Sequence, residues 1–168
     1  MTDVKAIKHV TVLLLVNKYG EFLLGQRHAD SFAAGYYELP GGKQEANESL
    51  LETVKREIYE ETTYKLADAK LIYETPVAYH FGTIPLHVFY AKLAKNALSE
   101  AVLANSKDLE RPNLLANEAA KLIWVKPEAA LKLPLLPILR RMLDTEAFRS
   151  VLAPFGKVDL SVDEAIKL

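Results

Sequence analysis

The residues best suited to catalysis or metal binding are glutamates, which are concentrated in one segment between Gly41 and Tyr64. Three of them, Glu57, Glu60 and Glu61, are spaced three and four residues apart, so a helix would place them side by side. Like charges at these spacings repel by roughly 0.2–0.5 kcal/mol per pair, which folding alone does not favour. The spacing therefore suggests carboxylates gathered to hold a cation.

A helix that carries these glutamates is predicted over Asn47–Thr62, with Asn47 as its N-cap. Its apolar residues recur at helical spacing and predict a buried stripe: Leu50, Leu51, Val54 and Ile58. At 3.6 residues per turn, Glu57 and Glu61 fall at the edge of this stripe, so they do not point fully into water. Partly buried carboxylates need a compensating cation, and Mg²⁺ suits a few carboxylates combined with substrate phosphates and waters.

Helix geometry alone leaves an ordinary alternative open. The same residues could form a solvated acidic face, stabilised by Glu52–Arg56 and Arg56–Glu60 ion pairs. Charge runs on helices are usually of this kind, and helix geometry by itself favours it.

The spacing of the whole segment favours the metal site, because it closely resembles the Nudix box. Gly42 is followed after five residues by Glu48, and after seven more by Arg56-Glu57 and then Glu60-Glu61. The box has glycine, five residues, glutamate, seven residues, arginine-glutamate, an aliphatic residue, any residue and two glutamates. Every charged position of this pattern is matched at the right spacing.

Two positions depart from the box. Thr63 stands where the family has a glycine, and Tyr64 replaces an aliphatic residue. The glycine closes the box helix, often in a left-handed conformation, so Thr63 is expected to alter that turn. Neither departure removes a metal ligand.

The resemblance extends to the MutT-like branch of the family, through the run Tyr36-Tyr37-Glu38-Leu39-Pro40-Gly41-Gly42 before the helix. It covers Val10–Val125 and continues to Leu143. It implies a Nudix-type α/β/α sandwich with a mixed β-sheet over residues 1–145. Residues 146–168 are expected to form a C-terminal helical extension that packs on the domain or on a second subunit.

The resemblance also implies roles for individual residues. It assigns Glu57, Glu60 and Glu61 as ligands of Mg²⁺, with Mn²⁺ as an alternative, and a backbone carbonyl of Gly41 or Gly42 as a further ligand. Arg56 would orient a glutamate by ion pairing, and Glu57 would activate water, although which glutamate is the base varies in the family. Together these residues form the predicted catalytic group, Glu57, Arg56 and Glu60. Glu118 resembles an extra ligand or base, and the alternative is a surface carboxylate.

Four residues are candidates for substrate binding. Arg27 stands where relatives use an arginine on the substrate phosphates, and Lys43 would contact a phosphate or be solvated. Tyr79 and Phe81 could stack on a base, or simply pack at the end of a strand. The sequence leaves both alternatives open.

The predicted reaction is hydrolysis of a (deoxy)nucleoside triphosphate to a nucleoside monophosphate and pyrophosphate. The alternatives are a Nudix hydrolase of dinucleoside polyphosphates or ADP-ribose, and a nucleotide-binding module without catalysis. The stretch from Leu133 to Pro137 lacks the asparagine that MutT-like relatives use to recognise oxidised guanine, which argues against that specificity.

Hydrophobic periodicity predicts the elements that position this site. Strands are expected over Val10–Val16, Glu21–Gln26, Tyr36–Leu39, Ala67–Val77, Ile84–Leu93 and Leu122–Val125. A short helix is expected to begin at Lys126-Pro127 and a longer one to include Pro137–Leu143, and a long polar loop is expected over Lys95–Asn117. The apolar run at Val10 is expected to be a buried strand and not a signal peptide.

Composition excludes several other classes of function. The chain has no cysteine, which excludes disulfides, cysteine-ligated zinc and a thiol nucleophile. The net charge of −1 gives no basic face for a nucleic-acid polymer, and no stretch is long enough to span a membrane. The sequence predicts a cytoplasmic protein, monomeric or homodimeric, that acts on a small nucleotide.

Overall fold

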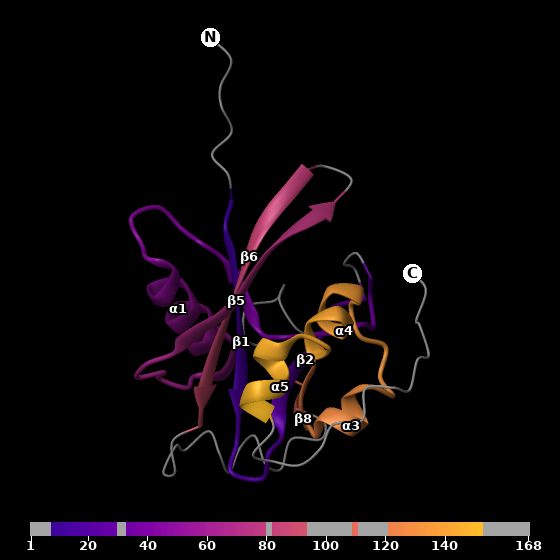
Figure 1. Ribbon diagram of the computed structural model, residues 1–168. Helices are drawn as coiled ribbons and strands as arrows, with labels where there is room; N and C mark the ends of the chain where they lie inside the picture. Colours follow the sequence, from indigo (N-terminus) through magenta and orange to yellow (C-terminus); the bar gives the residue numbers. More distant parts are fainter. Residues whose placement is uncertain (1–7, 30–32, 80–81, 94–108, 111–120, 153–168) are drawn as a thin grey trace.

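A seven-residue apolar strand, β1 (Val10–Val16), lies in the middle of a mixed sheet (Figure 1). It runs parallel to β6 (Gly82–Lys92), and antiparallel to both β2 (Phe22–Gln26) and β4 (Gly41–Lys43). The computed structural model describes residues 8–29, 33–79, 82–93, 109–110 and 121–152. The predicted strand over Val10–Val16 and the predicted mixed sheet are confirmed.

Within the described ranges, eight strands form this sheet in the order β5-β6-β1-β2-β8-β7, with β3 paired to β2 and β4 paired to β1. The remaining elements are β3 (Tyr37–Glu38), α1 (Leu50–Thr62), β5 (Lys70–Tyr79), β7 (Leu109–Glu110), β8 (Lys121–Val125), α3 (Pro127–Ala130), α4 (Pro137–Leu143) and α5 (Glu146–Leu152).

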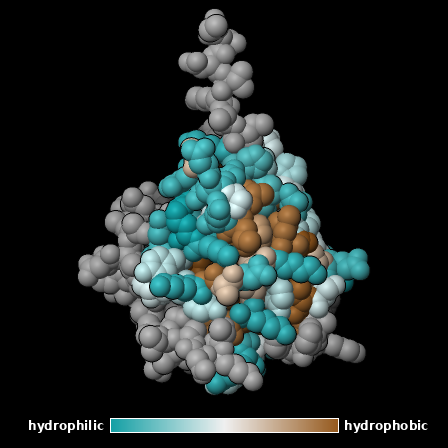
Figure 2. Space-filling view, turned by 90° about the vertical axis from the view of Figure 1, so that its left-hand side faces the viewer, coloured by the Kyte–Doolittle hydropathy of each residue, from teal (hydrophilic) through white to brown (hydrophobic). Residues whose placement is uncertain are grey.

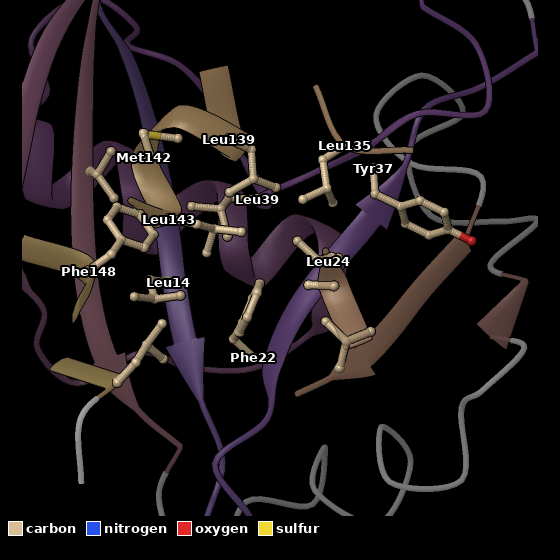
Figure 3. Packing of buried hydrophobic residues seen from close by; sticks show 14 of the residues in the cluster. Leu14, Phe22, Leu24, Tyr37, Leu39, Leu135, Leu139, Met142, Leu143 and Phe148 are labelled. Atoms are coloured by element: carbon tan, nitrogen blue, oxygen red, sulfur yellow. The ribbon is translucent and has the colours of Figure 1, made fainter. Parts of the chain in front are cut away.

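Alternating side chains of β1 divide the core into two layers, because successive residues of a strand point to opposite faces. Leu13 and Leu15 pack with Val54 and Ile58 of α1 on one face of the sheet. On the other face, residues of α4 and α5 form the second layer with the sheet (Figure 3). Its fully buried members include Leu14, Phe22, Leu24, Leu135, Leu139, Leu143 and Phe148. The fold is therefore the expected α/β/α sandwich.

Helix α5 belongs to this second layer. Its Phe148 is fully buried and its Leu152 is nearly so, both within the cluster that contains α4. Residues 146–152 therefore pack on the domain, while the division at residue 145 stays a prediction. Residues 153–168 lie outside the described part of the chain.

The N-cap of the box helix lies two residues later than the sequence suggested. Ser49, not Asn47, is the N-cap: its Oγ accepts a hydrogen bond from the Glu52 backbone N–H at 3.1 Å. The Glu52 carboxylate accepts in return from the Ser49 backbone N–H at 2.8 Å, which completes a capping box. Asn47 instead adopts a left-handed turn conformation with φ 65°, which asparagine tolerates.

The glycine pair also differs from expectation. The predicted strand ends at Leu39, whereas Gly41–Lys43 form a further strand, β4, on the edge of β1. A side chain at Gly41 would come within 2.0 Å of the Thr11 carbonyl oxygen. Glycine is needed here because two backbones approach closely.

The face that carries α1 has hydrophobic residues at its centre, bordered by hydrophilic ones (Figure 2). Leu50 and Leu51 at the start of α1 are only partly buried on this side of the sheet. None of the helices in the described ranges is both long and apolar enough to cross a membrane.

Candidate active site

Two glutamates of α1 are buried against the sheet. Glu57 is 4% exposed and Glu61 is 7% exposed, as their place at the edge of the apolar stripe predicts. Glu60 lies one step around the helix, and its side chain is 34% exposed. The helix thus presents two buried carboxylates with a third at the rim, and a purely solvated acidic face does not describe it.

Arg56 connects these glutamates to the start of the helix. Its Nη1 donates to Glu57 Oε1 at 2.9 Å and to Glu60 Oε2 at 3.2 Å. Its Nε and Nη2 donate to the two carboxylate oxygens of Glu48 at 3.1 and 2.8 Å. Such bidentate pairing fixes a guanidinium plane, so Arg56 is held in one orientation. The predicted Arg56–Glu60 pair is present, whereas the Glu52 carboxylate serves the helix cap.

The same contacts set the charge states of this network. Hydrogen bonds from Arg56 lower the pKa of Glu48 from 4.5 to about 2, together with bonds from the Glu45 backbone and Thr53. The Glu48 carboxylate in turn raises the pKa of Arg56 by hydrogen bonding. Both groups are therefore charged at neutral pH, and Glu48 anchors the arginine that contacts Glu57.

The glycine strand lies directly against the buried carboxylates. The Gly41 backbone N–H donates to Glu61 Oε1 at 3.2 Å. A side chain at Gly42 would come within 2.3 Å of Glu57 Cδ, so the missing side chain leaves the room that this carboxyl group occupies. The Lys43 carbonyl accepts a hydrogen bond from Arg56 Nη2 at 2.9 Å. Backbone and carboxylate oxygens are thus brought together at one place.

This set of donors fits a hard divalent cation in an open site. Among the described residues, no three acidic or histidine side chains converge closely enough to form a metal cage alone. Mg²⁺ does not require one, because it is usually bound by one or two carboxylates, waters and substrate phosphates. Glu57 and Glu61, buried beside backbone that carries no Cβ, fit that requirement.

Arg27 and Glu38 form a second cluster of polar side chains, separate from the box helix. Arg27 Nη1 donates to both carboxylate oxygens of Glu38 at 3.0 and 3.1 Å, with the two side chains 26% and 30% exposed. The pKa of Tyr79, at the end of β5, is raised by burial and then by the charge of Glu38, while Arg27 lowers it. The structure therefore brings Tyr79 near the Arg27–Glu38 pair.

The sequence pointed to Arg27 and Tyr79 separately but missed Glu38, which is close to both. Glu38 and Arg27 are eleven residues apart, and only the pairing of β3 with β2 brings them together. Strand pairing of this kind has no periodic signal in a sequence. Lys43 is exposed at the end of β4, and Glu118 and Phe81 lie outside the described residues.

A family model provides the decisive comparison: the NUDIX domain model matches residues 6–145. The chain belongs to the NUDIX domain family. The Nudix resemblance drawn from the box is thereby confirmed, as is the Nudix α/β fold. As a member of this family, the chain is a Nudix pyrophosphohydrolase.

Individual Nudix relatives point to the MutT-like branch. A CTP pyrophosphohydrolase of Escherichia coli (strain K12) is 29% identical over 126 residues, 75% of this chain and 82% of that protein. An 8-oxo-dGTP diphosphatase of Proteus vulgaris is 31% identical over 102 residues, 60% of this chain and 88% of that protein. The MutT protein of Methanosarcina mazei Go1 has a similar structure, with a TM-score of 0.62 and 26% identity. This match covers 90% of this chain and 94% of that one.

Proposed function

We propose that the protein hydrolyses a nucleoside or deoxynucleoside triphosphate to the monophosphate and pyrophosphate, and that it requires Mg²⁺. The observation that carries this proposal is the burial of Glu57 and Glu61 on one face of α1, against the backbone of Gly41 and Gly42. Two buried carboxylates beside one another are costly unless a cation joins them. The two relatives named for CTP and 8-oxo-dGTP support a nucleoside triphosphate as substrate.

Within this proposal Glu57, Glu60, Glu61 and the Gly41 carbonyl hold Mg²⁺, with Glu118 as a further candidate. When bound, the ion offsets the charge that develops on the phosphates and makes water a better nucleophile at neutral pH. Arg56 keeps the Glu57 carboxylate oriented through the 2.9 Å hydrogen bond to Oε1. Glu57 accepts a proton from the attacking water at a carboxylate oxygen.

Substrate contacts are assigned to the residues around this centre. Lys43 is exposed at the end of β4, next to the glycine pair, where its ammonium can meet a phosphate. Arg27 is assigned to the substrate phosphates, and Tyr79, which lies near the Arg27–Glu38 pair, is assigned to the base. Phe81, close to Tyr79 in the sequence, is retained as a further candidate for stacking.

A screen of substrates tests the proposal. Purified protein is incubated with the common nucleoside triphosphates, 8-oxo-dGTP, ADP-ribose and dinucleoside polyphosphates, with Mg²⁺, with Mn²⁺ and with EDTA. We expect release of pyrophosphate from a triphosphate, dependent on the metal and lost in Glu57→Gln. The matched control is Glu128→Gln, an exposed glutamate of α3 far along the chain from the box.

Two outcomes would contradict it. Turnover of ADP-ribose or a dinucleoside polyphosphate alone would replace the triphosphate with another Nudix substrate. Nucleotide binding without turnover under any metal condition, unchanged by Glu57→Gln, would indicate a binding module.

A further inference from the structure

A line of three polar side chains lies outside the glutamate site. His87 of β6 is 5% exposed, and its Nδ1 lies 2.7 Å from Glu74 Oε2 on the neighbouring β5. On the other side, His87 Nε2 lies 2.8 Å from His9 Nδ1, at the residue before β1. In the sequence His87 stands within an apolar strand, and nothing there indicates either partner.

The hydrogen-bond chemistry of this line restricts its protonation. An ionised carboxylate only accepts, so His87 Nδ1 carries a hydrogen and donates it to Glu74. Only one hydrogen fits between His87 Nε2 and His9 Nδ1 at 2.8 Å, so one of these nitrogens donates and the other accepts. Glu74 thereby fixes the orientation of His87, and His87 fixes the ring of His9.

The backbone of His9 is hydrogen-bonded to the Lys43–Gln44 peptide, which borders the active site. The His9 carbonyl accepts a hydrogen bond from the Gln44 N–H at 2.9 Å. The carbonyl of the same peptide unit, that of Lys43, accepts from Arg56 Nη2, also at 2.9 Å. The Lys43–Gln44 peptide is therefore held from both sides, once by the arginine of the box and once by the residue that the histidine line anchors.

We propose that Glu74, His87 and His9 are positioning residues for the active site, because together they fix the Lys43–Gln44 peptide and so direct the Lys43 side chain toward the substrate. The part concerning the substrate rests on the proposed function, whereas the fixing of the peptide does not. Side chains join β5 and β6 to His9, and the His9 backbone carbonyl joins Gln44, the residue after β4, across the strand β1 that separates β6 from β4 in the sheet.

Two accessible ends of the line allow a test that does not disturb the buried His87. His9→Ala removes the contact with His87, while His9→Asn retains a side-chain nitrogen at the position of Nδ1. Glu74→Gln keeps the shape of Glu74, whose side chain is 55% exposed, and removes its charge. Glu128→Gln serves again as the exposed matched control.

The direct readout is hydrogen exchange of the Gln44 backbone amide, measured by NMR without substrate or metal, with amides of β2 and β8 as internal references. We expect exchange about tenfold faster in His9→Ala, less acceleration in Glu74→Gln, and near wild-type exchange in His9→Asn. Unchanged Gln44 exchange in His9→Ala would overturn the proposal, whatever the activity of the protein. So would equal acceleration at all reference amides.

The second readout separates substrate binding from chemistry. Loss of a positioned phosphate contact that is equal in ground and transition states raises KM and leaves kcat unchanged. We expect a several-fold higher KM in His9→Ala, a kcat close to wild type, and rescue of KM in His9→Asn. Faster Gln44 exchange with an unchanged KM would overturn the link to Lys43. If no nucleotide is turned over, the proposed function fails, while the exchange experiment still decides whether the line fixes the peptide.

Discussion

The α-carbon of Gly42 lies directly against the carboxyl group of Glu57, such that an added methyl group would approach Glu57 Cδ to 2.3 Å and Oε1 to 2.4 Å. The obstacle is the end of a flexible side chain, so a larger residue can be accommodated by moving the glutamate. We therefore predict that Gly42→Ala leaves the free energy of unfolding almost unchanged. Because the carboxylate is displaced by about 1 Å, kcat/KM should fall about 100-fold.

Gly41→Ala is the contrasting variant. Its methyl group would meet the Thr11 carbonyl at 2.0 Å and Val12 Cα at 2.6 Å, and neither backbone atom can move without opening β4 from β1. We expect Gly41→Ala to lower stability by more than about 2 kcal/mol in urea unfolding. Comparable losses of stability in the two variants would contradict the assignment of Gly42 to the active site.

The ion pair of Glu48 with Arg56 predicts a specific pH dependence of stability. The folded pKa of Glu48 is about 2, below its ordinary value of 4.5, so its contribution is complete above pH 4.5 and is lost as the pH falls toward 2. At neutral pH this contribution is about 1–2 kcal/mol, because solvent screens an ion pair at the protein surface and reduces the 1.36 kcal/mol per pKa unit. Glu48→Gln should therefore destabilise the protein at pH 7 and much less at acid pH.

Urea unfolding of wild type and Glu48→Gln between pH 7 and pH 3 measures this difference. Glu128→Gln, in which an exposed carboxylate is lost, should follow the wild type throughout. A difference between wild type and Glu48→Gln that stays constant across the range would contradict the ionic origin of the effect.

Thr63 closes α1 with a left-handed backbone, at φ 62° and ψ 3°, and its N–H donates to the Tyr59 carbonyl. A β-branched residue in this conformation costs about 1–2 kcal/mol, and glycine adopts it freely. After subtracting the greater entropy of glycine in the unfolded chain, we expect Thr63→Gly to gain about 1 kcal/mol. The melting temperature should rise by about 2–4 °C.

The measurement is thermal unfolding of Thr63→Gly beside Thr63→Ala, which keeps a Cβ and should gain less. A lower melting temperature for the glycine variant would show that the Thr63 hydroxyl, which donates to the Thr62 carbonyl at 2.6 Å, outweighs the backbone strain.

The Nudix box could be located from the sequence because its pattern depends only on residues that lie close together along the chain. The burial of Glu57 and Glu61 followed from the helical period alone, since both lie on the edge of the stripe formed with Val54. The expectation that Thr63 alters the closing turn was wrong. Thr63 replaces the glycine of the family, yet it adopts the left-handed conformation that the glycine would supply.

The parts that the sequence missed depend on contacts between distant segments. Glu38 meets Arg27 only through the pairing of β3 and β2, and His9 meets His87 across 78 residues. The N-cap was misplaced for another reason. Both Asn47 and Ser49 are good capping residues, and the reciprocal hydrogen bond with Glu52 is available only to Ser49.

Thr11 offers a test of a different kind, because its hydroxyl is fully buried and has no hydrogen-bond partner among the described residues. A buried hydroxyl without a partner costs about 1–3 kcal/mol, and valine has nearly the same shape without it. We expect Thr11→Val to be more stable than wild type by about 1 kcal/mol in urea unfolding. Thr53→Val is the matched control, since the equally buried Thr53 hydroxyl lies 2.9 Å from both Glu48 Oε1 and the Ser49 carbonyl oxygen and donates its one hydrogen between them. That variant should be destabilised.

Thr11 pairs with Gly42 in the sheet, so a Thr11→Val variant that gains no stability and loses nucleotide affinity would instead assign its hydroxyl to the substrate site.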